Sequence, residues 1–466
     1  MPRAAATFEE RARRGLATPS LAAAIGNATD VRAERRRLAF AGADFDAMRA
    51  SGEAVRAHTV ANLDTYLERF AANAKARGTK VFFAGTATEA VAYARDVIRD
   101  HGARLVVKAK SMVSEEIELN EGLAAARTEV VETDLGEYIV QIAGERPAHI
   151  TAPAVHKSRG EVRDLFNRVH RADLSDDPGE LTRFAREVLR RKFLEADLGI
   201  TGVNFAVADT GSLVIVTNEG NGRMCTSLPP VHIAIMGMER IVPSFRELSV
   251  LLPLLTASAT GQRVTSYVNV VNGPRRPDEP DGPEEVHVVI LDGGRSAILA
   301  SEYRSILHCI RCGACQNVCP VFRQVGGHAY GGVYGGPIGA VLGPLLSGFR
   351  EAGDLPYASS LCAACTDACP VGIPLHDHLL GLRRDLSAER TGRGERLVFG
   401  WWSRLWGRAR TYRLVAGVAR VAQVPLARSG RIRRAPFPLS RWTRNRDLPP
   451  VARQTFREHR RRRDGR

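Results

Sequence analysis

Seven cysteines in the second half of the chain constrain its structure more than any other feature. Four of them form the run Cys309-x2-Cys312-x2-Cys315-x3-Cys319, and Pro320 follows directly. Three thiolates this close together reach three corners of one cubane cluster, and the proline turns the chain so that the fourth faces away. Paired C-x2-C units also hold tetrahedral zinc. Four cysteines at this spacing with the trailing proline favour iron and sulfide over zinc.

The second run contains three cysteines, Cys362-x2-Cys365-x3-Cys369, again followed by a proline. Aligned on this Cys-Pro pair, it matches the last three positions of the first run, and Ser359 stands at the missing first position. In two-cluster ferredoxins the last cysteine of each run ligates the other cluster. The pattern therefore predicts an electron carrier with two 4Fe-4S clusters.

This exchange of last cysteines divides the seven predicted ligands into two sets. Cluster 1 is assigned Cys309, Cys312, Cys315 and Cys369, and cluster 2 is assigned Cys319, Cys362 and Cys365. The second set admits a 3Fe-4S cluster, or a 4Fe-4S cluster whose fourth iron takes water, a substrate, Ser359, Ser360 or a ligand from a partner. Serine is an uncommon ligand and a common helix cap. An open iron is where we expect chemistry rather than simple electron passage.

Residues around the two runs carry less specific signals. The glycine-rich segment 325–343 is either a flexible connector or a place of close backbone approach to the clusters, where amide donors to sulfur raise the reduction potential. His308, Arg311 and His328 either tune the potential and carry protons or lie on the surface. Cys225 stands alone, and we expect a buried thiol without a ligand.

Length and composition favour a soluble protein of two to four domains. The chain has 466 residues, of which 44% are hydrophobic and 25% charged. Acidic and basic residues interrupt the N-terminus where a signal peptide needs an apolar segment. No apolar stretch reaches the roughly 18 residues that span a bilayer. Clustered cysteines without an export signal indicate the reducing cytoplasm.

Alternating patterns between the N-terminus and the first cysteine run predict an α/β domain with a parallel sheet. An amphipathic pattern predicts one long helix from Phe45 to Gly78. Predicted strands and helices then alternate at residues 80–84, 86–100, 104–108, 114–125 and 129–132, helices follow at 159–169 and 179–197, a strand–turn–strand at 200–217, and strands at 232–236, 264–271 and 286–291. We assign residues 1–44 to an N-terminal arm, 45–303 to the α/β domain and 304–390 to a mainly helical ferredoxin-type module.

The remaining residues, 391–466, form a basic C-terminal domain with an end predicted to be disordered. Residues 396–466 contain twenty arginines, no lysine and three acidic residues, so they account for the formal net charge of +15. Trp401, Trp402 and Trp406 lie among these arginines. This composition favours docking of a partner protein first and contact with an anionic membrane surface second. We expect no binding of nucleic acid.

Several short motifs together resemble a known family. They are Lys108-Ala109-Lys110-Ser111-Met112, Asp134-Leu135-Gly136-Glu137-Tyr138, Pro153-Ala154-Val155-His156-Lys157, Thr217-Asn218-Glu219-Gly220-Asn221-Gly222-Arg223 and the two cysteine runs, in this order. With them the chain resembles the iron–sulfur lactate utilization protein B family, from about Arg37 to the arginine-rich tail.

The resemblance implies a function and a fold. The function is iron–sulfur electron transfer in a multi-protein system that oxidises L-lactate to pyruvate in the cytoplasm and allows growth on L-lactate. Two other lactate-utilization proteins are the implied partners. The implied fold of the N-terminal domain is similar to that of sugar-phosphate isomerases and CoA transferases. The family is described as holding two 4Fe-4S clusters with seven cysteines, so the three-cysteine second site is a family feature.

The α/β domain also carries polar residues that are candidates for a substrate site. They are Lys110, Ser111, Asp134, Glu137, His156, Lys157 and residues 218–223. Open α/β sheets bind ligands beyond the carboxyl ends of their strands. Lys110, Lys157 and Arg223 are candidates for binding a carboxylate, and His156 for removing a proton. The alternative interpretation is that these residues have a structural role and brace loops or a subunit interface. An alternative function is a self-contained enzyme of the CoA-transferase or ligase type with structural clusters.

Overall fold

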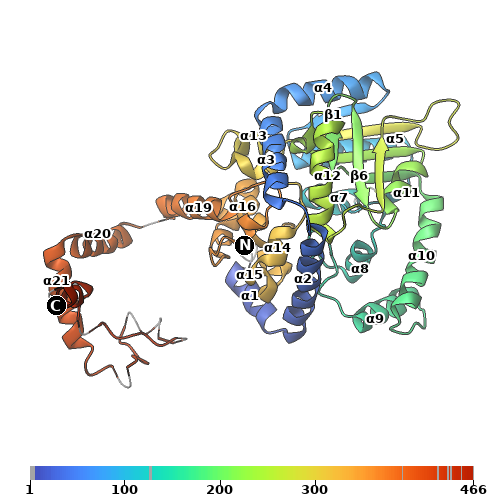
Figure 1. Cartoon of the computed structure of the whole chain (residues 1–466). Helices are drawn as coiled ribbons and strands as arrows, with labels where there is room; N and C mark the ends of the chain where they lie inside the picture. The colour runs from blue at the N-terminus through green and yellow to red at the C-terminus, as the bar shows by residue number, and fades with distance from the viewer. Residues whose placement is uncertain are drawn as a thin grey trace. The chain divides into compact units, whose positions relative to one another are not determined.

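The computed structural model describes residues 6–124, 128–390, 392–427, 430–437, 440, 443–444, 446–452 and 454–464. It divides into two compact units, Met1–Leu386 and Ser387–Arg466 (Figure 1). The first unit contains both the α/β domain and all seven cysteines of the two runs. No helix in the described ranges is long and apolar enough to cross a membrane.

A six-stranded parallel sheet forms the centre of the first unit, as the alternating pattern predicts. Its strands are β1 (Lys80–Ala84), β2 (Leu105–Lys108), β3 (Glu129–Glu132), β4 (Leu198–Gly202), β7 (Val231–Gly237) and β10 (Glu285–Leu291), in the order β1-β10-β7-β4-β2-β3. The inner strands are mostly apolar and rich in valine and isoleucine because both of their faces are buried.

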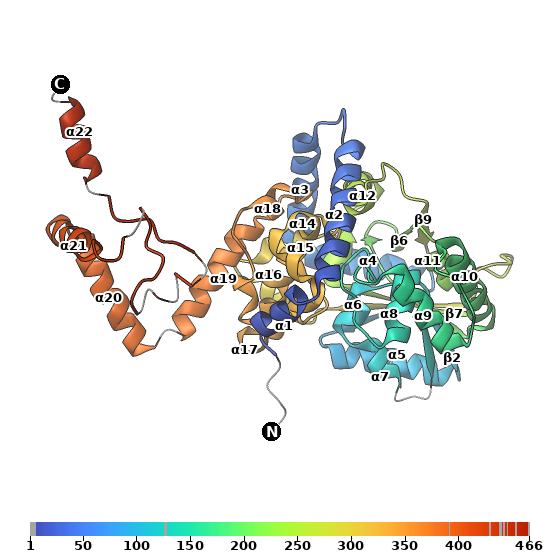
Figure 2. The same cartoon turned by 90° about the horizontal axis from the view of Figure 1, so that it is seen from below.

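Helices cover both faces of this sheet (Figures 1 and 2). One face packs against α5 (Ala87–Asp100), α6 (Met112–Glu116) and α7 (Leu119–Ala124). The other face packs against α4 (Leu63–Ala76), α8 (Leu135–Ala143), α9 (Arg159–His170) and α10 (Pro178–Glu195). Neighbouring valines divide between the two layers: Val106 faces the first group and Val107 the second.

The strand order changes direction between β2 and β4. From β2 the chain continues outward to the edge strand β3, whereas from β4 it continues to β7 on the opposite side. In open parallel sheets such a switch point leaves a crevice beyond the carboxyl ends of the two strands. This crevice is the part of the fold that positions a candidate ligand pocket.

A second sheet has four strands in the order β8-β5-β6-β9 and was not predicted as a separate sheet. Its strands are β5 (Phe205–Val207), β6 (Ser212–Thr217), β8 (Ile241–Val242) and β9 (Tyr267–Val271). The segment 200–217 thus holds three strands, because β4 ends in the parallel sheet before β5 and β6 form a hairpin. The remaining helices of the domain are α11 (Asn221–Ser227), η1 (Met238–Arg240), α12 (Phe245–Thr260) and α13 (Arg295–Leu299).

The single helix predicted for residues 45–78 is wrong, because it breaks at Asn62 into α3 (Phe45–Ala61) and α4. Asn62 has φ −122° and ψ 36°, outside the helical region. Its side chain donates to the carbonyl of His58 over 2.8 Å, which competes with the backbone pattern of a helix. The helix predicted for 114–125 is also interrupted, at Glu118 with φ 50°; residue 125 lies outside the described ranges.

The N-terminal arm forms helices α1 (Phe8–Leu16) and α2 (Pro19–Ala39), which pack against the cysteine-bearing module. Ile25 is fully buried, and its Cδ1 lies 3.0 Å from where a Cβ would stand on Gly326. The ring of Phe8 meets Tyr330 edge to face, with 5.4 Å between centroids. The arm is therefore part of the module's core.

Short helices build the cysteine-bearing module. They are η2 (Arg304–His308), α14 (Ala314–Val318), α15 (Pro320–Val325), η3 (Gly327–Tyr330), α16 (Gly336–Ser347), α17 (Phe349–Ala352), η4 (Leu355–Tyr357), α18 (Ala364–Asp367) and α19 (Leu375–Arg390). The glycine-rich segment 325–343 is a close-packed part of this module. A Cβ on Gly327 would lie 1.8 Å from the carbonyl oxygen of Ala148. The loop that contains Ala148 therefore approaches the glycine-rich segment too closely for any residue except glycine.

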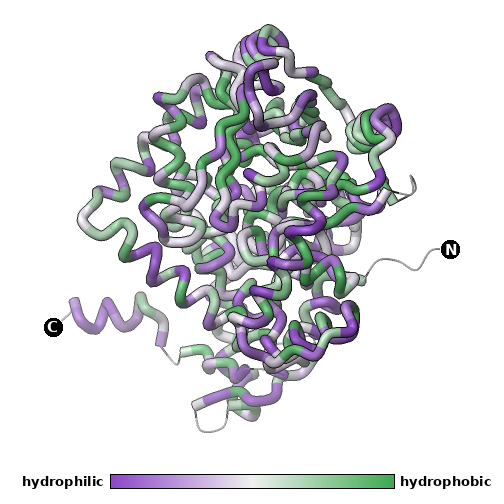
Figure 3. Tube along the Cα trace, turned by 90° about the vertical axis from the view of Figure 1, so that its right-hand side faces the viewer, coloured by the Kyte–Doolittle hydropathy of each residue, from purple (hydrophilic) through white to green (hydrophobic). Residues whose placement is uncertain are grey.

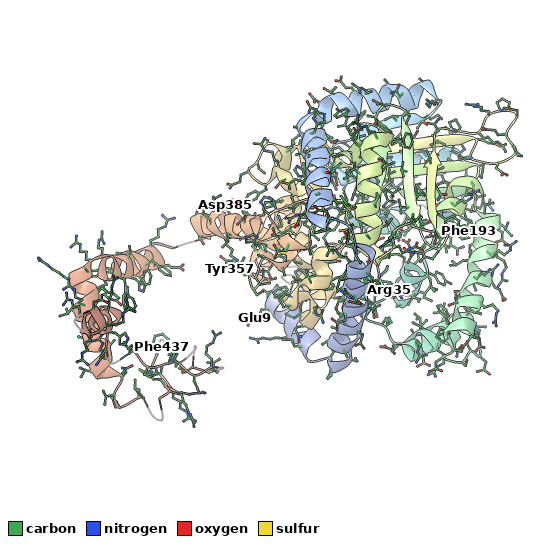
Figure 4. The ribbon with its side chains drawn as sticks, viewed as in Figure 1. Glu9, Arg35, Phe193, Tyr357, Asp385 and Phe437 are labelled. Carbon is green, nitrogen blue, oxygen red and sulfur yellow. The ribbon has the colours of Figure 1, made fainter. Side chains whose placement is uncertain are left out.

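The C-terminal unit contains α20 (Arg393–Gly407), α21 (Ala409–Ala422) and α22 (Phe456–Asp464). Trp401 and Trp402 are 63% and 58% exposed, and Phe437, labelled in Figure 4, is 81% exposed. Helix α22 runs to Asp464, and its hydrophilic character is visible in Figure 3. Thr455 and Glu458 form a capping box that starts this helix.

Candidate iron–sulfur centre and adjoining pocket

The structure gathers the four cysteines assigned to cluster 1 around one small cavity. Cys309, Cys312, Cys315 and Cys369 all line it, together with apolar residues of the two loops. Cys369 comes from the second run, as the crossed pattern requires. Apart from these cysteines and Arg311, the lining is apolar and includes Ile150, Ile338 and Val371.

The three cysteines assigned to cluster 2 form a separate group. Cys319 lies within electrostatic range of both Cys362 and Cys365, and Cys365 in turn is close to Cys315 of the first group. Cys362 is exposed, whereas Cys319 and Cys365 are buried. The two groups are therefore adjacent, and the second reaches the surface at Cys362.

The two cysteine loops have the same backbone conformation. Arg311 and Leu361, each directly before the second cysteine position, have φ values of 60° and 55°. Gly313 and Ala363, each directly after it, have φ values of 75° and 63°. Non-glycine residues rarely adopt positive φ. Positive φ recurs at matching positions of the two loops, which indicates that both loops fold around the same kind of bound group.

Ser359 occupies the place in the second loop that Cys309 occupies in the first. The amide of Arg311 donates to Cys309 Sγ over 3.4 Å, and the amide of Leu361 donates to Ser359 Oγ over 3.1 Å. Ser360 instead lies beside Cys362, where its hydroxyl holds the pKa of that exposed thiol below its usual value. The alignment that places Ser359 at the missing cysteine position thus agrees with the geometry.

The surroundings of the sulfur atoms fit iron–sulfur clusters. Amides of Phe322 and Ile373 donate to Cys319 and Cys369 over 3.5 and 3.4 Å. Burial raises the pKa of Cys312 to about 12 and that of Cys369 to about 11. Thiols in such surroundings ionise when a metal supplies positive charge. Packed thiols, converging amides and an apolar lining are the features that a buried cluster requires.

A buried charge cluster joins the α/β domain to the first cysteine loop. Glu239 accepts from Arg295 Nε over 2.7 Å and from Arg311 Nη2 over 3.4 Å, and Arg240 lies nearby. Although burial opposes ionisation, Arg295, Arg240 and Arg311 lower the pKa of Glu239 to about 2. Arg311 also stacks on Tyr334, with 4.5 Å between guanidinium and ring centroid.

Arg56, on helix α3, connects several segments of the same region by hydrogen bonds. It is almost completely buried and donates to the carbonyl oxygens of Glu239, Ile241, Leu307 and His308. These carbonyls belong to the α/β domain and to the segment just before the first run. The neighbouring His308 is buried, and burial together with Arg56 lowers its pKa to about 4, so it remains neutral at neutral pH.

A pocket of about 370 Å³ lies at the carboxyl ends of β2 and β4. Its lining includes six of the candidate positions, namely Lys110, Ser111, Asp134, Asn218, Glu219 and Asn221. The structure therefore brings together residues 110–111, 134 and 218–221 from separate loops. Glu137 lies just behind, with Oε1 3.5 Å from Lys110 Nζ, and burial raises its pKa to about 7.

Three other candidate residues lie outside this pocket. His156 Nε2 is 2.6 Å from Glu145 Oε2, Lys157 pairs with the same carboxylate, and Arg223 is exposed on α11. The ring of His156 meets His328 edge to face, with 4.6 Å between centroids, and His328 Nε2 is 2.7 Å from the carbonyl oxygen of Arg146. The contacts of His156 and Lys157 with Glu145 correspond to the alternative interpretation, in which these residues brace loops.

Most of the positive charge in the pocket comes from arginines that the sequence did not assign to a substrate site. Arg32, Arg240 and Arg311 line it together with Lys110. Arg32 lies on α2, far away in sequence, and as one of four arginines near the end of that helix it predicts a solvated side chain. Cys225 is buried, as expected, and burial raises its pKa to about 12.

Comparison with known proteins gives three family matches that together cover most of the chain. Residues 67–291 match the LUD domain, residues 305–373 a 4Fe-4S dicluster domain, and residues 384–464 the C-terminal domain of lactate utilisation protein B. Fold and cysteine loops thus define an iron–sulfur protein of the dicluster class built on an α/β domain.

Relatives over the full length make the assignment specific. Lactate utilization protein B of Bacillus licheniformis is 50% identical over 97% of this chain and 95% of its own. The protein of the same name from Bacillus subtilis is 49% identical over the same shares. The chain belongs to the lactate utilization protein B family. A solved DUF162 family protein from Deinococcus radiodurans, 19% identical over 44% of this chain and 98% of its own, has a TM-score of only 0.20.

Proposed function

We propose that this chain is the electron-transfer subunit of a multi-protein system that oxidises L-lactate to pyruvate, with two other lactate-utilization proteins as partners. Its family membership supports the lactate part of this proposal. The observation that carries the electron-transfer part is the pair of adjacent cysteine groups, one enclosed and one reaching the surface at Cys362. We place the system in the cytoplasm.

In this proposal Cys309, Cys312, Cys315 and Cys369 hold a 4Fe-4S cluster, and Cys319, Cys362 and Cys365 hold a second cluster. Ser359 takes the fourth position of the second site. Clusters bound there supply one-electron acceptors and donors. The protein's own residues exclude water from the first site, since Ile150, Ile338 and Val371 surround it. Exposure of Cys362 provides an exit toward a partner.

The basic C-terminal unit is the proposed docking element. Its exposed tryptophans and arginines offer apolar area and positive charge to an acidic partner surface. Contact with an anionic membrane surface is the second use that this composition supports. Binding of nucleic acid is not part of the proposal.

Growth provides the physiological test. A strain that lacks this gene, and has no second copy, should fail to grow on L-lactate as sole carbon source and should grow normally on pyruvate. Expression of the intact gene should restore growth on L-lactate. Unimpaired growth of the deletion strain on L-lactate would sink the physiological claim.

Spectroscopy tests the chemistry separately. Anaerobically purified protein should contain about eight irons for two cubanes, or about seven if the second site holds a 3Fe-4S cluster. Dithionite should bleach the protein reversibly. If the clusters were merely structural, as in the alternative of a self-contained CoA-transferase-like enzyme, they would not cycle at a physiologically reachable potential.

A further inference from the structure

The pocket at the carboxyl ends of β2 and β4 lies at the switch point of the parallel sheet. The loop after β2 contributes Lys110 and Ser111, and the segment after β4 contributes Asn204. Asp134 follows β3. Loops that leave neighbouring strands in opposite directions open a crevice between them. The pocket therefore occupies the position where an α/β sheet most often binds a ligand.

The charge of the lining selects an anion. Four cationic side chains line the pocket, and they are Arg32, Lys110, Arg240 and Arg311. Two carboxylates, Asp134 and Glu219, oppose them. Asp134 is already engaged as the N-cap of α8, where its Oδ1 accepts from the amide of Glu137 over 3.1 Å. Glu239 and Glu137, behind the lining, already pair with Arg311 and Lys110, so an oxyanion with one negative charge would meet mainly Arg32 and the free Nε and Nη1 of Arg311.

Several buried polar atoms of the lining have no hydrogen-bond partner in the described part of the chain. They are Lys110 Nζ, Asn221 Oδ1, Thr217 Oγ1, and Nε and Nη1 of Arg311. Arg311 and Asn221 are more than nine-tenths buried. Buried polar groups in native proteins are normally paired, so a group of unpaired atoms around one cavity indicates a missing polar ligand.

Arg311 connects this pocket to the first cysteine group. The same side chain lines the pocket and the cavity enclosed by Cys309, Cys312, Cys315 and Cys369, and Ile150 does so as well. Arg240 also reaches across, since its Nη1 donates to the carbonyl of Cys309 over 3.4 Å. A charge placed in the pocket is thus separated from cluster 1 by single side chains.

We propose that this pocket binds a small oxyanion, the carboxylate or phosphate group of a metabolite, and that the bound anion lowers the reduction potential of cluster 1 through Arg311. An added negative charge beside the cluster disfavours its reduced, more negative state, and it offsets the positive charge of Arg311. The effect on the potential rests on the proposed function, because it requires cluster 1. Binding of the anion does not.

Binding is tested first, by anaerobic titration calorimetry on the full-length protein with its clusters. L-lactate, pyruvate and inorganic phosphate are used as separate probes, so that carboxylate and phosphate are distinguished. At least one should bind with one site per chain. Lys110→Gln should weaken that binding at least tenfold, because it removes a positive charge of the lining that has no closer partner than Glu137, 3.5 Å away. Arg223→Gln is the matched control, since it removes an exposed positive charge on α11 outside the pocket.

Thr217→Val provides a second variant that keeps the side-chain volume and removes an unpaired hydroxyl. It should weaken binding as well, which keeps the test valid if Lys110→Gln fails to fold. If none of the three anions binds, or if the binding variants bind as tightly as the parent, the pocket assignment is overturned. An equal loss in Arg223→Gln also overturns it, because the effect would then be one of net charge.

The potential is tested second, by redox titration monitored by EPR with and without the anion that binds. The midpoint of cluster 1 should shift to a lower value, and Lys110→Gln should remove the shift at the same anion concentration. A bound anion that leaves the midpoint unchanged, or raises it, refutes the coupling through Arg311. Binding without any reducible cluster would refute the proposed function and leave the anion site standing.

Discussion

Ser359 shows how one side chain can distinguish two loops of the same shape. Its hydroxyl accepts a hydrogen bond from the amide of Leu361, as the sulfur of Cys309 does from the amide of Arg311. The φ values of the flanking residues also match. The loop geometry thus favours a fourth ligand at this position, and an alkoxide is a weaker ligand for iron than a thiolate. If the second site holds a 4Fe-4S cluster, as proposed, its fourth iron would be the one most easily lost.

Ser359→Cys should hold that iron more firmly. After oxidation with ferricyanide, we expect the EPR signal of a 3Fe-4S cluster to fall roughly tenfold, which corresponds to about 1.4 kcal/mol of additional binding. Ser359→Ala should increase the signal. Ser360→Ala serves as the control, because Ser360 lies beside Cys362 rather than at the first ligand position. Equal signals in parent and Ser359→Cys would show that this serine does not face the cluster.

Glu239 supplies a negative charge that the buried arginines of this region need as a partner. Its Gln variant leaves Arg295 and Arg311 buried beside a neutral group, and breaking a buried ion pair costs about 3–5 kcal/mol. We expect that decrease in the free energy of unfolding, measured by urea denaturation of the anaerobic protein. Glu118→Gln, which removes an exposed partner of Arg146, should cost less than about 1 kcal/mol.

The pH dependence of stability follows from the same residue. The pKa of Glu239 is lowered from 4.5 to about 2 by Arg295, Arg240 and Arg311. A carboxyl group with a depressed pKa stabilises the folded state above its unfolded value and loses this contribution as the pH falls toward the folded value. The difference in stability between the parent and Glu239→Gln should therefore shrink between pH 4.5 and about 2. A difference that stays constant over this interval would argue against an ionised Glu239.

The role of an individual residue was predictable where the spacing of residues along the sequence determines the chemistry. The cysteine runs and the motifs around Lys110 and Asn221 are local patterns, and the structure places each group at a cavity. Arg32 and Arg240 were not predictable, because their role arises from contacts between segments far apart in sequence. His156 and Lys157, candidates for removing a proton and binding a carboxylate, lie outside the pocket and share Glu145.

At the level of elements, helix α2 belongs to the cysteine module although it lies almost 300 residues earlier in the sequence. Its alanine-rich composition carries weak amphipathic patterning, so the sequence alone indicates only an arm. The contact depends on Gly326, where the close approach of Ile25 leaves little room for a side chain. Such a contact between distant segments leaves no periodic signal in either.

Ile25→Ala should loosen this contact. Truncation of a fully buried isoleucine costs about 2–5 kcal/mol, and the cavity lies directly over the glycine-rich segment. We expect iron to be released faster to an iron chelator, followed by absorbance under anaerobic conditions. Val31→Ala on the same helix is the matched control, since Val31 is 51% exposed. Equal release rates in both variants would mean that α2 does not protect the clusters.

The parallel sheet was predictable because its strands are continuous apolar runs between amphipathic helices. The second sheet was not separable from the first, since β4 and β5 are adjacent in sequence and both are apolar. The break at Asn62 was missed because the apolar spacing of the two helices continues across it. In each case the pattern indicated the type of element and tertiary contacts decided its limits.

At the level of the whole molecule, the compact first unit contains both cysteine groups and the pocket, and the C-terminal unit contains the excess of positive charge. The uneven charge was plain from the sequence, because arginines are concentrated after residue 395. What these arginines contact is a property of a complex, and neither composition nor the fold of one chain specifies it.

A chain that ends at Arg390 should separate the two roles. Iron content and EPR spectra should remain as in the parent, because every cysteine of the two runs precedes this position. Growth on L-lactate should be lost if the C-terminal unit docks a partner. Co-purification of the partners with the full chain, but not with the shortened one, is the direct measurement. Normal growth of the shortened strain would exclude an essential docking role for this unit.

The exposure of Cys362 also bears on how the protein survives in air. It is the one exposed sulfur among the seven, so dissolved oxygen should attack cluster 2 before cluster 1. A partner docked over Cys362 would shield this point of entry. The free subunit would then be the form most at risk, and a cell exposed to air would preserve the protein best by assembling it promptly.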